Sequence, residues 1–161
     1  MARVALITAA YTARSKKASA QRCVNLFPEV NPQDAPAPAM FYGTPGYTLW
    51  STMPGDGAVR LEYVTSTGIL FGVRGLKVYR YNDGSWIDSG SLGSTVGRAV
   101  AADNGKQVVF VDGSPTAPVV DLSTFEKSLM SGDGWYGADF AFFLNGRIIF
   151  NKPNTQQFYW T

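Results

Sequence analysis

The chain has 161 residues, of which 45% are hydrophobic and 16% charged, which is enough for one domain with a buried core and a lightly charged surface. Its 14 Lys and Arg against 12 Asp and Glu leave a net charge of +2, so charge alone predicts neither a nucleic-acid nor a membrane partner. There is no histidine and a single cysteine, Cys23, which excludes His-based catalysis, His-ligated metals and an internal disulfide.

The first part of the chain, residues 1–58, is rich in proline. Between Pro28 and Pro38 the sequence PEVNPQDAPAP excludes a helix or a central strand and predicts an extended, polyproline-like arm. Large apolar residues flank this stretch: Phe27, Met40, Phe41, Tyr42, Tyr47 and Trp50. Such flanks indicate an arm laid against a protein surface, since linkers in solvent are polar.

From residue 59 onward, apolar and polar residues alternate between tight turns, as in β-strands. Residues 76–81 alternate, Asp83-Gly84 supplies a turn, and residues 85–88 return, a pattern typical of a β-hairpin. The nearest approach to a helical pattern, residues 122–130, is short and has no caps. We therefore predict an all-β fold over residues 59–161.

Three segments repeat one plan: a turn glycine, then an aliphatic strand that ends in phenylalanine. The phenylalanines are Phe71, Phe110 and Phe150, so the period is about 40 residues, the size of a four-stranded propeller blade. The repeat favours propeller-like blades, and a β-sandwich stays open as the alternative. Because a propeller needs at least about four blades, we expect the natural chain to continue beyond Thr161, or neighbouring subunits to cover its last strand.

One motif and one acidic pair invite a catalytic interpretation. Residues 132–137, GDGWYG, match a dinucleotide-binding fingerprint, but strand-like residues follow where that site requires a helix. Asp133 and Asp139 flank aromatic residues as in a glycosidase, yet aspartate beside glycine is ordinary in turns. We predict a non-enzymatic protein with no catalytic, cofactor-binding or metal-ligating residues.

The N-terminal arm carries the most specific pattern in the chain. Its segments AYTARS (residues 10–15), AQRCVNLFPE (residues 20–29), NPQDAP (residues 31–36) and YGTPG (residues 42–46) closely resemble the start of the packaged-DNA stabilisation, or tail nozzle, proteins of short-tailed bacteriophages. The resemblance covers about the first fifty residues well and the β-repeats more loosely. Members of that family are considerably longer than this chain.

This resemblance implies a structural virion protein of the phage tail, assembled in the host cytoplasm. It implies a β-propeller subunit that forms a ring with its own copies, a homo-hexamer, below the portal and head-to-tail adaptor. Such a ring extends the DNA channel, retains packaged DNA without reading its sequence, and carries the tail spike, fibre or needle proteins. No membrane partner is implied.

The arm is expected to hold neighbouring subunits together, because Arg and aromatic side chains dominate interface energy and proline leaves little ordering entropy to lose. The candidate interface residues are Tyr11, Arg14, Arg22, Asn25, Leu26, Phe27, Pro28, Glu29, Tyr42, Pro45 and Gly46. Packing of the arm on its own propeller remains the alternative. A second functional hypothesis is a glycan- or protein-binding module that stacks sugars on exposed Trp86, Trp135 and Tyr136.

Overall fold

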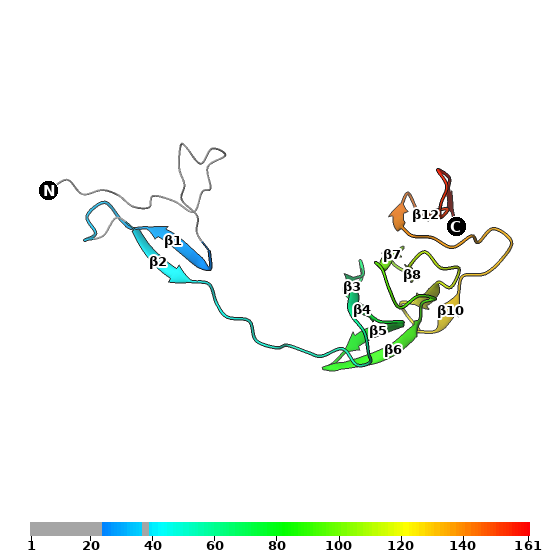
Figure 1. The fold of residues 1–161 in the computed structure, drawn as a ribbon, viewed down its shortest axis with the longest axis horizontal. Helices are drawn as coiled ribbons and strands as arrows, with labels where there is room; N and C mark the ends of the chain where they lie inside the picture. Colours follow the sequence, from blue (N-terminus) through cyan, green and yellow to red (C-terminus); the bar gives the residue numbers. More distant parts are fainter. Residues whose placement is uncertain (1–23, 37–38) are drawn as a thin grey trace. The chain divides into compact units, whose positions relative to one another are not determined.

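The computed structural model describes residues 24–36 and 39–161 of the chain. The chain forms two compact units, Met1–Trp50 and Ser51–Thr161 (Figure 1). Residues 51–58 belong with the strands of the second unit, so the boundary lies at Ser51 and not at residue 59 as the proline-rich composition predicts. Tyr11, Arg14, Arg22 and Cys23 lie outside the described residues.

The described part of the first unit is a β-hairpin, so the arm is not a polyproline-like segment throughout. Strands β1 (Leu26–Val30) and β2 (Ala39–Gly43) pair antiparallel, with Pro28 opposite Phe41. A proline fits here because a two-stranded sheet has only edge strands, whose outer N–H groups make no ladder bond. Pro32 and Pro36 fall in the connection between the two strands.

The second unit contains three antiparallel sheets, and none of them closes into a barrel. The first sheet is formed by β3 (Val59–Val64), β4 (Leu70–Arg74), β5 (Lys77–Asn82) and β6 (Ser85–Ser91). The second is formed by β7 (Val100–Asp103), β8 (Gln107–Val111), β9 (Pro118–Asp121) and β10 (Lys127–Leu129). The third is formed by β11 (Ala141–Leu144), β12 (Arg147–Asn151) and β13 (Phe158–Trp160). The all-β prediction is confirmed, and the described residues contain no helix.

The predicted hairpin is confirmed at β5 and β6. Asn82 pairs with Ser85, so Asp83 and Gly84 form a two-residue turn in which both φ angles are positive, 43° and 83°. Two positive φ angles define the turn type whose twist matches the twist of paired strands. The GDGWYG motif lies in the connection between β10 and β11, as expected for a loop.

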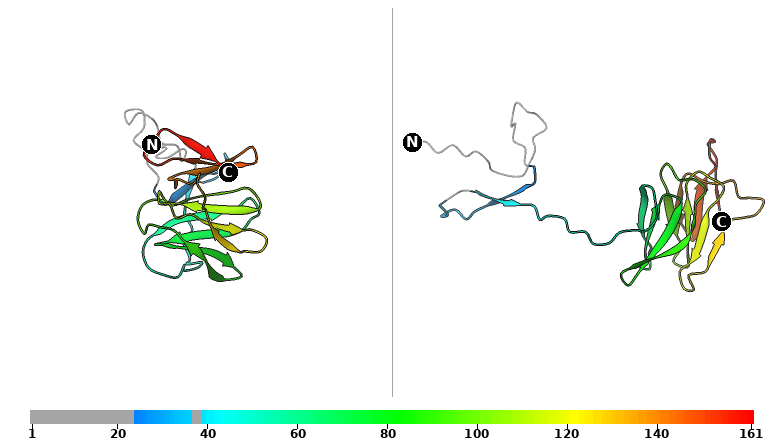
Figure 2. Two further views of the ribbon diagram at one scale, coloured as in Figure 1. Left: turned by 90° about the vertical axis from the view of Figure 1, so that its right-hand side faces the viewer. Right: turned by 60° about the horizontal axis from the view of Figure 1, so that its bottom comes forward.

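The three sheets follow one another as layers, visible in Figure 2 as the sequence of green, yellow and red strands. One buried cluster joins the first sheet to the second, and a separate one joins the second to the third. Phe71, Phe110 and Phe150 each lie on the second strand of their sheet and are at most 1% exposed. The repeated phenylalanine predicted from the sequence is therefore a core residue in every sheet.

The outer face of the first sheet is covered by the chain that enters the second unit. A Cβ on Gly72 would lie 2.1 Å from Met53 Cε, so the methionine packs directly on the strand backbone. Beside it, Trp86 Nε1 donates a hydrogen bond to Ser51 Oγ at 2.9 Å. Met53 is 5% exposed, and this end of the stack is closed.

Candidate functional site

The outer face of the third sheet is apolar and lies open to solvent. Strand alternation and register place one set of side chains on it, opposite the buried face that carries Ile148 and Phe150. We call this set the third-sheet face: Phe142, Leu144, Arg147, Ile149, Phe158 and Trp160. At its margin, Asn151 is bonded to the backbone of the segment that precedes β11. The first sheet covers its outer face with residues 51–57, and the third has no such cover among the described residues.

The exposure of this face is unusual for a surface of large hydrophobic side chains. Phe142 is 41% exposed, Phe158 69% and Trp160 55%. Phe140 extends the same apolar surface, with its ring 6.0 Å from that of Phe142. Large contiguous exposed apolar patches are typical of interaction surfaces, which makes this face a candidate for one.

Arg147 supplies the single charge on the third-sheet face, since β11, β12 and β13 contain no other charged residue. Its guanidinium lies over the ring of Trp160, 5.7 Å from the ring centroid, within the range of a cation–π contact. No acidic partner holds this side chain among the salt bridges of the described residues. The face therefore offers an unneutralised positive charge in an apolar setting.

The third sheet also ends on an open edge. Lys152 N donates to Gln157 O, and Thr161 N donates to Ile148 O. In an antiparallel ladder the backbone groups of alternate residues face opposite sides, so the N–H and C=O groups of Phe158 and Trp160 point away from β12. No described strand pairs with that side of β13.

The hairpin of the first unit carries a second apolar surface. Register places Phe27 directly opposite Tyr42, and Glu29 opposite Met40, all on one side of the hairpin. We call these four residues the hairpin face. Phe27 is 58% exposed, Met40 49% and Tyr42 47%, so the structure brings three of the predicted interface residues together with a methionine that the sequence analysis did not select.

The other predicted interface residues that the structure describes are placed differently. Leu26 and Pro28 lie on the opposite side of the hairpin from Phe27, and Pro28 is buried while Leu26 is 47% exposed. Asn25 precedes β1 with a positive φ of 55°, and its carbonyl accepts a hydrogen bond from Thr44 N. It therefore closes the open end of the hairpin. Pro45 and Gly46 follow β2 in an exposed segment outside any strand.

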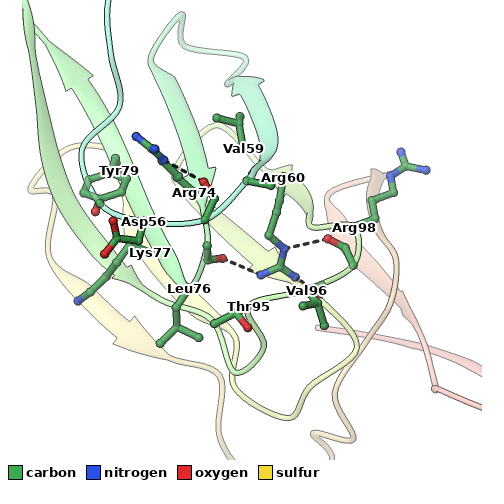
Figure 3. Close-up of a pocket in the computed structure, with 15 residues that line it drawn as sticks. Asp56, Val59, Arg60, Arg74, Leu76, Lys77, Tyr79, Thr95, Val96 and Arg98 are labelled. Atoms are coloured by element: carbon green, nitrogen blue, oxygen red, sulfur yellow. Dashed lines mark hydrogen bonds between the residues drawn. The ribbon is translucent and has the colours of Figure 1, made fainter.

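A cleft of about 930 Å³ lies at one end of the first sheet, lined by residues 55–60, the turn between β4 and β5, and the loop that includes Val96 and Arg98 (Figure 3). The Arg60 guanidinium lies at its floor and donates to the carbonyls of Gly97 (2.8 Å) and Val96 (2.8 Å). It also donates to those of Gly75 and Ser94.

Most basic side chains of this cleft bind carbonyl or carboxylate groups of the protein. Arg60 lies 3.4 Å from Asp112, and the two side chains are 3% and 0% exposed. Arg74 donates to the carbonyls of Gly57 and Met53, and Lys77 pairs with Asp88 at 2.9 Å. Arg98 projects away from the other labelled side chains in Figure 3. The network holds the loops around the first sheet in place and leaves little charge for a ligand.

A carboxylate on β7 joins the first sheet to the second. Asp103 accepts hydrogen bonds from Tyr63 Oη at 2.7 Å, from Ser66 N at 3.1 Å and from Ser66 Oγ. Burial pushes the pKa of Asp103 upward, but the hydrogen bonds from Ser66 and Tyr63 outweigh it and hold the pKa below its usual value. Burial, together with the bond to Asp103, raises the pKa of Tyr63 to about 12, so this phenol stays a donor.

Two of the three aromatic residues proposed as sugar-stacking platforms are only partly exposed. Trp86 and Trp135 are half-buried rather than exposed. Trp135 Nε1 donates to Pro115 O at 2.6 Å, and its ring packs edge-on against Phe150. Only Tyr136 is exposed, at 51%, with Lys152 Nζ 4.0 Å from its ring centroid.

The residues of the third-sheet face were not selected from the sequence as a functional surface. The run AFFL of β11 is apolar at every position, so alternation gave no sign of which side chains face outward. The sequence predicts that the aromatic last strand lies at an exposed edge. Only the strand register shows that Phe158 and Trp160 share a face with Phe142 and Arg147.

Among the described residues, no cluster of His, Cys, Asp and Glu side chains is suited to hold a metal ion. No helix long and apolar enough for a membrane span is found there either. Comparison with protein-family models and with curated proteins finds no match to this chain.

Proposed function

We propose that this protein is a structural subunit of the tail of a short-tailed bacteriophage, forming a ring below the portal and the head-to-tail adaptor. In this role it extends the DNA channel, helps to retain packaged DNA and carries later tail parts. The sequence of the arm, which resembles the tail nozzle proteins, is the starting point of the proposal. The observation that carries it is the presence of two separate exposed apolar surfaces, the hairpin face and the third-sheet face.

A permanent assembly needs contact surfaces of this kind. Charged residues are depleted at the core of protein interfaces because their desolvation is costly. The hairpin face has one charged residue among its four, and the third-sheet face has one among its six. We infer that a ring subunit buries both surfaces against its neighbours.

We further propose that the three sheets are consecutive blades of a β-propeller. Two of them are four-stranded antiparallel meanders, the third has three strands in the same sequential order, and each sheet packs on the next through its broad face. Four-stranded sheets packed face to face around a centre are the building units of propellers. A β-sandwich of two sheets fits less well, because the second sheet is covered on both faces.

The test of the proposed function is assembly of the full chain. Light scattering coupled to gel filtration should give a mass of several subunits, and negative-stain images should show rings, with the chain alone or mixed with a portal–adaptor complex. Deletion of residues 1–30 should abolish assembly and leave a β-rich circular dichroism spectrum. A chain that stays monomeric at high micromolar concentration, and does not bind the connector, would overturn the proposal.

A further inference from the structure

We propose that Asn145 is a modification site, where the side-chain amide is lost spontaneously as ammonia and water leaves aspartate or isoaspartate in its place. Asparagine is a thermolabile residue, and the chain has it before glycine at two places, Asn104-Gly105 and Asn145-Gly146. Glycine has no side chain to hinder attack by its own nitrogen, and it restricts the backbone least. The reaction needs only this turn and water, so it is independent of the proposed tail role.

The reaction proceeds in two steps. The backbone nitrogen of Gly146 attacks Asn145 Cγ and forms a new N–C bond, while the C–N bond of the side-chain amide breaks and ammonia leaves with the proton of the attacking nitrogen. The product is a cyclic imide, a succinimide. Water then adds to one of the ring carbonyls and breaks its bond to the nitrogen, which gives aspartate or isoaspartate. No oxidant or reductant takes part.

Asn145 and Gly146 form the two-residue turn between β11 and β12. Leu144 pairs with Arg147, and the φ angles of Asn145 and Gly146 are 48° and 83°. Both turn residues are exposed, and a Cβ on Gly146 would meet nothing within 4 Å. In the part of the chain that the structure describes, the Asn145 side chain and the Gly146 N–H have no hydrogen-bond partner. The attack requires rotation about the ψ angle of Asn145, and an exposed turn with few contacts opens at a low free energy.

The exposure of this turn does not depend on what covers the faces of the third sheet. Both faces of the second sheet are covered by its neighbours, yet Asn104 and Gly105, between β7 and β8, are exposed. The first sheet is covered by the second sheet and by residues 51–57, and Asp83 and Gly84 are exposed there too. These turns lie at the ends of their strands, so a layer stacked on the sheet leaves them in solvent.

Asn104 has the same following residue but is held in place by hydrogen bonds. Its Oδ1 accepts from Lys106 N at 3.0 Å and from Gln107 N at 2.8 Å. The attacking nitrogen is bound as well, since Gly105 N donates to Asp103 Oδ1 at 3.0 Å, and a carboxylate acceptor opposes loss of the N–H proton. Succinimide formation here must first break these bonds, which slows it relative to the turn between β11 and β12.

Isoaspartate would lengthen this turn. Its main chain runs through Cβ and Cγ, so an extra methylene enters a two-residue turn whose geometry fixes the register of the flanking strands. We therefore expect the pairing of Leu144 with Arg147 to be weakened. Both products also place a carboxylate close to Arg147 in the sequence.

The experiment follows the mass of two peptides of the full chain during incubation at mildly alkaline pH. Cleavage by trypsin after Lys and Arg releases residues 99–106, with Asn104, and residues 128–147, with Asn145; neither peptide contains a second Asn or a Gln. Each mass gain therefore identifies its residue. In the folded chain Asn145 should convert about tenfold or more faster than Asn104, because hydrogen bonds to an ionised acceptor are strong. In guanidinium chloride the two rates should be similar, since both residues precede glycine.

Asp103→Ala tests the cause of the difference. It removes the acceptor of the Gly105 N–H, so it should speed the conversion of Asn104 and leave that of Asn145 unchanged; circular dichroism checks that the fold is retained. An Asn104 that stays slow in this folded variant would refute the assigned protection. Equal rates for the two asparagines in the folded wild type, or an Asn145 that converts only in guanidinium chloride, would overturn the inference.

A second measurement tests the consequence for the fold. Chain converted at Asn145, purified by ion exchange, should unfold at a lower urea concentration than the unconverted chain. Asn145→Asp is the matched control, because it has the charge of both products on a regular backbone, and it should stay close to wild type. Equal stability of the converted chain and this variant would refute the effect of the extra methylene. None of these measurements requires assembly, so failure of the tail role leaves them unaffected.

Discussion

Replacement of Arg60 by methionine should strongly destabilise the second unit. The side chain is 3% exposed and is bound by four backbone carbonyls and the fully buried Asp112. Methionine fills similar space but donates nothing, so Asp112 is left as a buried charge without its counterion. Breaking a buried ion pair by removing one partner costs about 3–5 kcal/mol. Water can reach the carbonyls of Val96 and Gly97 at the rim, which favours the lower end, about 3 kcal/mol.

This loss is a large share of the roughly 5–15 kcal/mol that stabilises an ordinary domain. Urea unfolding should show a midpoint about 1.5 M lower than wild type at a slope of about 2 kcal/mol per M. Fluorescence of Trp86 and Trp135, both in packed positions, reports the transition. Arg98→Met is the matched control, because this arginine lines the same cleft from an exposed position; its stability should stay within about 0.5 kcal/mol of wild type. Equal effects of the two substitutions would refute the assigned role of Arg60.

Three further substitutions test the packing of the sheets by denaturation of the full chain. Gly72→Ala should destabilise by about 1 kcal/mol, because the new methyl group must displace the end of the Met53 side chain. Gly134→Ala, which meets nothing within 4 Å, should be nearly neutral, and equal stabilities of the two variants would contradict the covered outer face. Asp103 has a lowered pKa in the folded state, so its contribution to stability is present above the pKa of the unfolded chain and lost as the pH falls through the lower folded value. Asp103→Asn should therefore flatten the loss of stability as the pH falls below about 5, and an unchanged slope would argue against the hydrogen bonds that Ser66 and Tyr63 donate to this carboxylate. Phe110→Ala should cost about 3–5 kcal/mol, since the ring is fully buried against Phe71 with centroids 5.4 Å apart, and a loss below about 1 kcal/mol would contradict its place in the core.

Local sequence signals determined the individual strands and turns of this protein. Asp83-Gly84 forms the expected two-residue turn because glycine and aspartate accept the positive φ angles that such turns require. The phenylalanine period located a core residue in each sheet, because each of these phenylalanines lies on the buried side of the second strand of its sheet. The turns and the strand pattern depend on residues adjacent in the chain, and these can be read directly from the sequence.

The arm shows where local reasoning fell short. Proline restricts the backbone around it to extended angles, and both an isolated arm and an edge strand satisfy that restriction. Pairing between β1 and β2 spans the whole proline-rich connection, so its register depends on contacts that no short window of sequence reveals. The predicted residues Phe27 and Tyr42 were consequently found on one surface only when their strands were paired.

The sequence by itself determined that this chain is built of short strands in a repeating order, with a proline-rich segment ahead of them and no histidine chemistry. Tertiary structure decided which apolar side chains are buried and which remain open: Phe150 and Phe142 lie on adjacent strands of one sheet, yet only Phe142 faces solvent. The reason is that the exposed side of a strand depends on which face the neighbouring layer covers, and the layers come from residues distant in the chain. The surroundings of Arg147 are decided in the same way, because the register of β11, β12 and β13 places its charge within an apolar face.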